Sequence, residues 1–346
     1  MDVVGHELWL TASAGATRGP VADGQAVLHA ALAAASRARR LGGDQCLDAE
    51  LPPRDLASSS LDLVGALHRA VASGGIRVHY QPKVSTATGA IVGFEALARW
   101  TRGDGTVLPP SDFIPLAEEI GLIDAIGEQV LHQACLDAVG WAAQAGGAAP
   151  GVAVNVSGRQ LVSGKLAVNV AAALGGSGLP AERLTLEVTE TTLAEDLESA
   201  ISALREVKAL GVGVSVDDFG IGYSSLGYLS RFPIDELKVD RSFVQRMVSD
   251  PAVDAIVRSV IALSHTLGLR CTTEGVEHQD QLDHLSALGC DFFQGYLFSP
   301  AVANDQVPTL LSATRRFLLA GAVDRVVGVL TPSPGIAYRS PPSTIA

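Results

Sequence analysis

The feature that most constrains the fold is an alternation of short apolar runs with helical patterns between residues 76 and 298. The runs with the length and composition of buried strands are residues 76–84, 90–100, 151–157, 183–190, 211–220, 236–240, 269–277 and 290–298. Helical periodicity fills several gaps, as in 195–211 and 251–268. Such alternation predicts an α/β fold with parallel strands joined by helical crossovers. Eight strands favour a (β/α)8 TIM-type barrel over an open doubly wound sheet, whose glycine-rich opening motif is absent.

Polar side chains lie at or near the ends of most of these runs, namely Glu95, Asn155, Glu187, Asp217, Asp218, Lys238, Glu274 and Gln294. The carboxyl ends of barrel strands meet at one mouth, where active sites are built. Carboxylates crowded there repel one another and require a compensating cation. Oxygen donors favour a hard divalent cation, and the lack of His and Cys ligands disfavours zinc. One acidic residue alone is more often a turn residue or a helix cap, so the prediction rests on the whole series.

Composition narrows the class of partner. The 346 residues include 25 Lys and Arg against 37 Asp and Glu, which gives a formal net charge of −12. Duplex nucleic acid and anionic membranes require clustered cations, so neither is the expected partner. The four cysteines show no CxxC spacing and are expected to be reduced thiols. Neither a signal peptide nor a membrane segment is recognisable, so a cytoplasmic protein is expected.

Seven motifs follow one another along the chain: GFEALARW, VAVNVS, LEVTE, VDDFGIGYSSL, LKVDRSF, TEGVE and FFQGYLF. In this order they resemble the motif series of the EAL-domain cyclic di-GMP phosphodiesterases, and the resemblance extends over residues 61–300. It implies a barrel enzyme that hydrolyses cyclic di-GMP to linear pGpG, with two Mg²⁺ or Mn²⁺ ions activating a water molecule. The resemblance also implies a homodimer. Ca²⁺ is expected to bind but to inhibit, because it accepts longer and less regular coordination.

Carried over residue by residue, the resemblance implies two metal sites. The ligands of the first would be Glu95, Asn155, Glu187 and Asp217. Asp217 would bridge to a second ion, which would also use Asp218 and Glu274. Lys238 matches the lysine that contacts the attacking water. The expected catalytic residues are therefore Lys238, Glu274 and Asp217.

Further matches concern the substrate and one loop. Positions that contact the substrate or support the metal ligands are matched by Gln81, Leu97, Arg99, Glu277 and Gln294. Glu190 matches the glutamate that anchors the loop DFGIGYSSL, whose glycines suit a segment that folds across the mouth. Ile221 stands where the family usually has threonine. Loop closure or dimer coupling is therefore the property in which this chain is expected to differ.

The expected layout follows from the same patterns. Residues 1–50 resemble the last strand and helix of a GGDEF domain without its signature loop, so no cyclase activity is expected. Residues 51–60 are expected to be a linker, 61–305 the barrel, 306–330 a C-terminal helix and 331–346 a flexible tail. Two alternatives stay open, a non-catalytic cyclic di-GMP receptor or scaffold and a barrel phosphohydrolase for another phosphodiester. Receptors of this family usually lack metal ligands or the catalytic lysine, all of which are present here.

Overall fold

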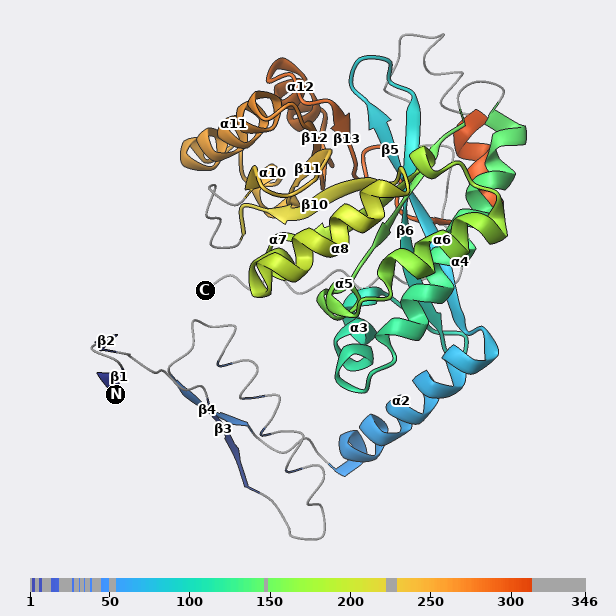
Figure 1. Ribbon diagram of the computed structural model, residues 1–346, viewed down its shortest axis with the longest axis vertical. Helices are drawn as coiled ribbons and strands as arrows, with labels where there is room; N and C mark the ends of the chain where they lie inside the picture. The colour runs from blue at the N-terminus through green and yellow to red at the C-terminus, as the bar shows by residue number, and fades with distance from the viewer. Residues whose placement is uncertain are drawn as a thin grey trace. The chain divides into compact units, whose positions relative to one another are not determined.

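The computed structural model divides the chain into two units, Met1–His68 and Arg69–Ala346 (Figure 1). The residues that it describes are 2–3, 6–7, 14–18, 27, 31, 34, 38, 45–49, 54–145, 149–221 and 229–312. In the first unit, β1 (Asp2–Val3) pairs antiparallel with β2 (His6–Glu7). A second pair is parallel, between β3 (Ala14–Thr17) and β4 (Cys46–Ala49). Residues 27, 31, 34 and 38 are helical, and the resemblance of residues 1–50 to the end of a GGDEF domain stays a prediction.

The helix α2 (Arg54–Ser73) corrects the expected linker. Residues 54–60, which were expected to belong to that linker, are helical. The sequence is compatible with this start, because neither proline nor glycine occurs within residues 54–60. The helix ends at Ser73, and Gly74 follows it with a φ of 73°, a conformation that commonly ends helices.

The second unit is built around a closed ring of strands. Its members in ring order are β6 (Ile91–Thr101), β8 (Gly151–Asn155), β9 (Leu184–Thr189), β10 (Gly213–Phe219), β11 (Glu236–Val239), β12 (Arg270–Thr273), β13 (Phe292–Phe293) and β5 (Ile76–Ser85). Pairing of β5 with β6 closes the ring. The short strands β7 (Val107–Leu108) and β14 (Val302–Ala303) extend it at β6 and β5. All eight predicted strands are therefore present, and the predicted barrel is confirmed.

One strand runs against the predicted direction. β5 is antiparallel to both of its ring neighbours, β6 and β13, whereas the alternation predicted parallel strands throughout. Only residues 86–90 connect β5 to β6, and a parallel crossover requires a dozen residues or more. The two strands therefore form a hairpin, and the barrel is a variant of the all-parallel type.

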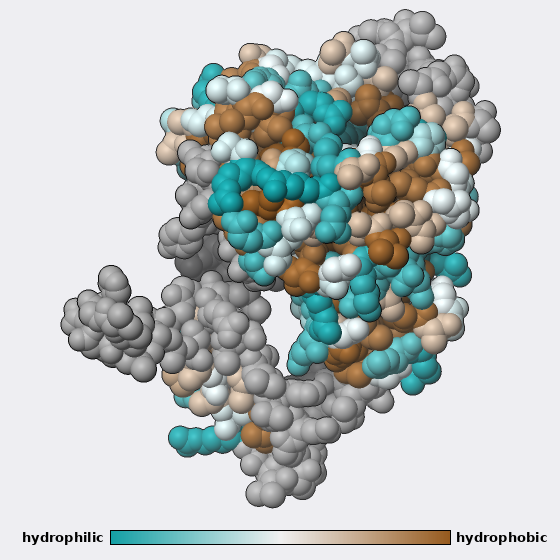
Figure 2. All heavy atoms as spheres, viewed as in Figure 1, coloured by the Kyte–Doolittle hydropathy of each residue, from teal (hydrophilic) through white to brown (hydrophobic). Residues whose placement is uncertain are grey.

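Helices lie outside the ring of strands, as Figure 1 shows for α4, α6, α8 and α11. The described residues of this unit include the helices α3 (Pro110–Glu119), α4 (Ile123–Ala145), α5 (Gly158–Val162), α6 (Leu166–Ser177), α7 (Glu190–Glu195), α8 (Leu197–Ala209), α10 (Arg241–Val244), α11 (Pro251–Thr266) and α12 (Gln279–Ala287). Figure 2 shows hydrophilic and apolar side chains interspersed over the face of the second unit that is turned toward the viewer. None of the described helices combines the length and apolar content needed to cross a membrane.

The C-terminal predictions fall mostly outside the described residues. Residues 307–312 are helical, in agreement with the start of the helix expected over 306–330. The remainder of that helix and the tail expected over 331–346 lie outside the described part of the chain.

Candidate active site at the barrel mouth

Three carboxylates from three strands meet inside the barrel. Glu95 of β6, Glu187 of β9 and Asp217 of β10 each offer an oxygen, and these oxygens lie within 4.8 Å of one another. All three residues are buried. The strand register accounts for part of this meeting. Glu187 pairs with Asn155 of β8 on one side and with Ser215 of β10 on the other, and Asp217 lies two residues beyond Ser215 on the same face. Glu95, expected at a strand end, instead lies in the middle of an eleven-residue strand.

Lys238 lies at the centre of this group with no exposed surface. Its Nζ is 2.8 Å from Glu187 Oε2, 3.3 Å from Asp217 Oδ1 and 3.7 Å from Glu95 Oε2. A fourth carboxylate follows β12, and Glu274 Oε1 lies 2.5 Å from the same nitrogen. We call these residues, Glu95, Glu187, Asp217, Lys238 and Glu274, the mouth cluster. One ammonium thus faces four carboxylates, which leaves a large deficit of positive charge.

Amide side chains orient Glu95 from two sides. Asn155 Nδ2 donates to Glu95 Oε1 at 2.7 Å, and Gln294 Nε2 donates to Glu95 Oε2 at 2.5 Å. Gln294 also contacts Gln81 Oε1 at 3.2 Å. The amide contacts therefore bring Asn155, Gln294 and Gln81, all predicted from the sequence, to one carboxylate of the mouth cluster.

Asp218 follows Asp217 on β10, where the register of that strand with β11 is irregular. Its φ is 54°, in the left-handed region, and its backbone N–H donates to Asp217 Oδ1 at 2.9 Å. Burial raises the pKa of Asp218 to about 6, helped by the charges of Asp217 and Asp240. Non-glycine residues in this conformation concentrate at functional sites.

Asp240 is a residue that the sequence analysis missed. It is 7% exposed and faces Asp218 closely enough to raise the pKa of that carboxyl. It also caps α10, where its Oδ1 accepts the N–H of Ser242 at 2.8 Å. A signal was present, since Asp240 follows Lys238 by two residues and a strand returns to the same face with that period.

Burial and charge pull the carboxyl pKa values in different directions. Burial raises the pKa of Glu187 to about 8, although Lys238 lowers it, and burial also holds the pKa of Glu274 well above its usual value. For Glu95, burial is outweighed by the charge of Lys238 and the bonds from Gln294 and Asn155, so its pKa is lowered. Burial therefore favours the protonated forms of Glu187 and Glu274, and a metal ion would compete with protons for these two groups.

The donor set fits hard divalent cations. Carboxylate and amide oxygens surround the site, with no His or Cys among the described residues of the mouth cluster. Glu274 Oε1 is buried and receives no hydrogen bond of good geometry from the described residues, despite its ion pair with Lys238. Buried oxygens without donors are what a cation would satisfy.

A pH-dependent effect of Mg²⁺ on stability is expected from these shifts. The pKa of Glu187 is raised from 4.5 to about 8, so the folded state binds this proton more tightly than the unfolded state. Its contribution to metal-free stability is therefore lost as pH rises through that window. Metal binding releases the same protons and strengthens with pH. Saturating Mg²⁺ should raise Tm more at pH 8 than at pH 5, by several degrees in thermal unfolding. Equal shifts at both pH values would contradict this linkage.

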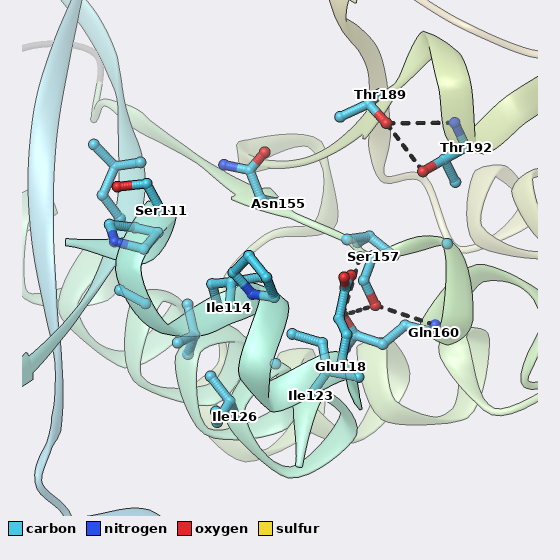
Figure 3. Close-up of a pocket in the computed structure, with 18 of the residues that line it drawn as sticks. Ser111, Ile114, Glu118, Ile123, Ile126, Asn155, Ser157, Gln160, Thr189 and Thr192 are labelled. Atoms are coloured by element: carbon cyan, nitrogen blue, oxygen red, sulfur yellow. Dashed lines mark hydrogen bonds between the residues drawn. The ribbon is translucent and has the colours of Figure 1, made fainter. Parts of the chain in front are cut away.

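A cavity of about 470 Å³ opens beside the cluster. Asn155, Asp218 and Leu97 line the cavity, and Asn155 contacts Glu95 of the mouth cluster. Figure 3 shows Ile114, Ile123 and Ile126 gathered on one side of the cavity, with Asn155, Thr189 and Thr192 on another. Such a pairing of an apolar wall with a few polar groups is typical of a small-molecule site.

The other predicted residues lie in different surroundings. The Glu190 carboxylate accepts the backbone N–H of Gly220 at 2.9 Å, at the start of the predicted loop, and Ile221 beside it is 60% exposed. Residues 222–228 of that loop lie outside the described residues. Arg99 Nη1 donates to Ala98 O at 2.9 Å. Gln245 Nε2 donates to Glu277 Oε1 at 3.5 Å, and within the described part of the chain Glu277 makes no hydrogen bond or ion pair with the mouth cluster.

Comparisons with known proteins agree with this geometry. The family model of the EAL domain matches residues 64–301. The bifunctional diguanylate cyclase/cyclic di-GMP phosphodiesterase MucR of Pseudomonas aeruginosa is 38% identical over 305 residues, which cover 87% of this chain and 44% of that protein. The cyclic di-GMP phosphodiesterase RocR of the same species is 39% identical over 247 residues, which cover 71% of this chain and 62% of that protein. The chain thus spans less than two thirds of either relative.

A solved structure shows the same fold. The PaMucR phosphodiesterase in complex with c-di-GMP has a TM-score of 0.68 and 41% sequence identity, and the match covers 71% of this chain and 99% of that one.

Proposed function

The chain belongs to the EAL domain family, and on that basis we propose that it is a divalent-cation-dependent phosphodiesterase that hydrolyses cyclic di-GMP to linear pGpG. One observation carries the proposal. Four carboxylates surround the Lys238 ammonium within 3.7 Å, and three of them bring oxygens within 4.8 Å of one another. A receptor would bind the dinucleotide without requiring this concentration of buried charge.

Two groups of residues would hold two cations. The first group is Glu95, Asn155, Glu187 and Asp217. The second is Asp217, Asp218 and Glu274, to which the position of Asp240 beside Asp218 adds a fourth carboxylate. When bound, the cations lower the pKa of the attacking water and stabilise charge on the phosphate oxygens.

In the proposed reaction, residues of the chain orient the attacking water and the phosphate. Hydrolysis joins the water oxygen to phosphorus and breaks the P–O3′ bond, which leaves a 5′-phosphate and a 3′-hydroxyl. The water gives up one proton and the leaving 3′-oxygen gains one, so protons balance. The Lys238 ammonium has three donors and can hold the attacking water beside the carboxylates that it contacts. Arg99 offers a planar fork suited to a phosphate, and the cavity beside Asn155 would receive one guanine half of the substrate.

Metal dependence is the test of this function. Purified protein with cyclic di-GMP should form pGpG, detected by chromatography, in Mg²⁺ or Mn²⁺ and not in excess chelator. Ca²⁺ should support substrate binding with little turnover, since its ligands lie at about 2.3–2.6 Å in irregular geometry.

The controls separate the alternatives. Full hydrolysis in chelator would exclude a metal-dependent reaction. Tight binding of cyclic di-GMP in Mg²⁺ without pGpG formation would instead identify a receptor. Turnover of other phosphodiesters with weak binding of cyclic di-GMP would identify a different hydrolase.

A further inference from the structure

A second set of charges lies inside the barrel, beneath the mouth cluster. Its centre is Glu236 of β11, whose side chain is 1% exposed. Glu236 accepts hydrogen bonds from Lys83 Nζ at 2.9 and 3.1 Å and from Thr272 Oγ1 at 2.8 Å. Arg270 Nη2 lies 3.9 Å from its other oxygen. Burial alone would raise the pKa of Glu236, but Lys83 and these bonds hold it below its usual value, so the group is ionised.

An aromatic ring completes the set. Lys83 Nζ lies 5.2 Å and Arg270 Cζ 5.6 Å from the centroid of Phe292. Both cations therefore contact an anionic carboxylate and an aromatic face. We call Lys83, Glu236, Arg270, Thr272 and Phe292 the lower layer. It joins side chains of β5, β11, β12 and β13, which are neighbours in the ring.

The same four strands build one side of the mouth. On each of these strands a residue of the lower layer stands two positions from a residue of the mouth. The pairs are Glu236 and Lys238, Thr272 and Glu274, Phe292 and Gln294, and Lys83 and Gln81. Side chains two residues apart on a strand share a face and stand about 7 Å apart. The mouth residues are linked among themselves by the contacts of Lys238 with Glu274 and of Gln294 with Gln81. The position of each strand along the barrel axis therefore fixes both its side chain in the lower layer and its side chain at the mouth.

Stability is a weak reason for such a layer. Taking a carboxylate and an ammonium out of water costs about as much as their attraction returns, and apolar replacements of equal volume are often tolerated. The best attested use of buried polar groups is to fix one arrangement among several. Resting on the proposed function, we propose that Glu236 is a positioning residue that holds Lys238 and Glu274 in place for hydrolysis.

The test removes the ion pair without leaving a buried charge. Glu236→Met combined with Lys83→Met keeps side-chain volume and should keep the fold in urea unfolding. We expect kcat for cyclic di-GMP to fall about 10–100-fold, as for the loss of groups that orient metal ligands. Substrate affinity in Ca²⁺, measured by calorimetry, should change less than about threefold, while Mn²⁺ affinity should fall about tenfold.

A matched control lies on the same strand. Tyr80 is buried on the other face of β5, where its hydroxyl donates to Asp137 of α4. Tyr80→Phe should lower stability and leave kcat and Mn²⁺ affinity unchanged. The proposal would be overturned if kcat fell in proportion to the loss of stability in both variants. It would also be overturned if kcat stayed at the wild-type value in the double variant.

Two further outcomes are also decisive. If the double variant does not fold, the same measurements on Lys83→Met alone test the proposal. This single variant removes the ion pair between β5 and Glu236 and leaves Glu236 in contact with Arg270 and Thr272. If the wild-type protein forms no pGpG, the proposed function has failed, and Mn²⁺ affinity then judges the positioning role separately. Wild-type Mn²⁺ affinity in the variant would overturn that role.

Discussion

Asp217→Asn is expected to lower hydrolysis of cyclic di-GMP by about 100-fold or more, the scale seen when one key stabilising group is lost. Asp217 is 8% exposed, lies 3.3 Å from Lys238 Nζ and accepts the N–H of Asp218. In the proposed mechanism it serves both cations, so asparagine removes one charge from each coordination sphere. The amide has the same shape and keeps an oxygen acceptor. The loss should therefore appear in kcat and metal affinity, measured by product chromatography and calorimetry.

The fold should survive this substitution. Burial raises the pKa of Asp217, which shows that its charge is unfavourable in the metal-free barrel. Removing that charge should leave metal-free stability unchanged or higher. Asp254→Asn is a suitable control, since Asp254 pairs with Arg258 and His284 on the helices outside the barrel. Unchanged turnover in a folded Asp217→Asn variant would show that Asp217 does not serve the reaction.

Lys238→Met should lower kcat about 10²–10⁴-fold, the usual contribution of a group that assists proton transfer or orients the nucleophile. Methionine keeps the volume of a fully buried side chain and removes only the charge and its donors. Because Lys238 is proposed to act on the attacking water, its loss should affect the transition state more than substrate binding. Affinity for cyclic di-GMP in Ca²⁺ should change little in calorimetry.

The structure adds a second consequence for this variant. Four carboxylates would lose their shared cation, so the metal-free variant should be less stable than wild type, and Mn²⁺ should restore most of the loss. Lys208→Met is the control, because Lys208 pairs with Asp235 away from the mouth cluster. Near wild-type kcat at saturating metal would reduce Lys238 to a charge-balancing residue.

Much of the barrel could be predicted because its signals are local. Apolar runs of strand length and helices of regular period each depend on neighbours in sequence, and α11 was predicted at its observed bounds within two residues. The start of α2 was missed because polar and small residues before Ser60 resemble a linker, although they are acceptable in a helix.

The sequence predicted which residues form the site better than it predicted the contacts that these residues make. Glu95, Glu187 and Asp217 were expected together and do meet. Asp240 was not predicted as a site residue, although its spacing from Lys238 places both residues on one face, because the carboxylate that faces it comes from another strand. The cavity wall from α3 and α4 was missed for the same reason, since those helices carry no polar motif.

By itself the sequence determined the number of barrel strands and the gathering of acidic side chains at one mouth, because these follow from local periodicity and from the rule that parallel strand ends converge. Only the tertiary structure decided that one ammonium serves four carboxylates and that Glu236 meets Lys83 across 153 positions of the chain. The physical reason is that burial and charge pairing depend on which strands are neighbours in the ring. Desolvation then sets the protonation of each carboxyl, and residues distant in sequence supply the charges that oppose it.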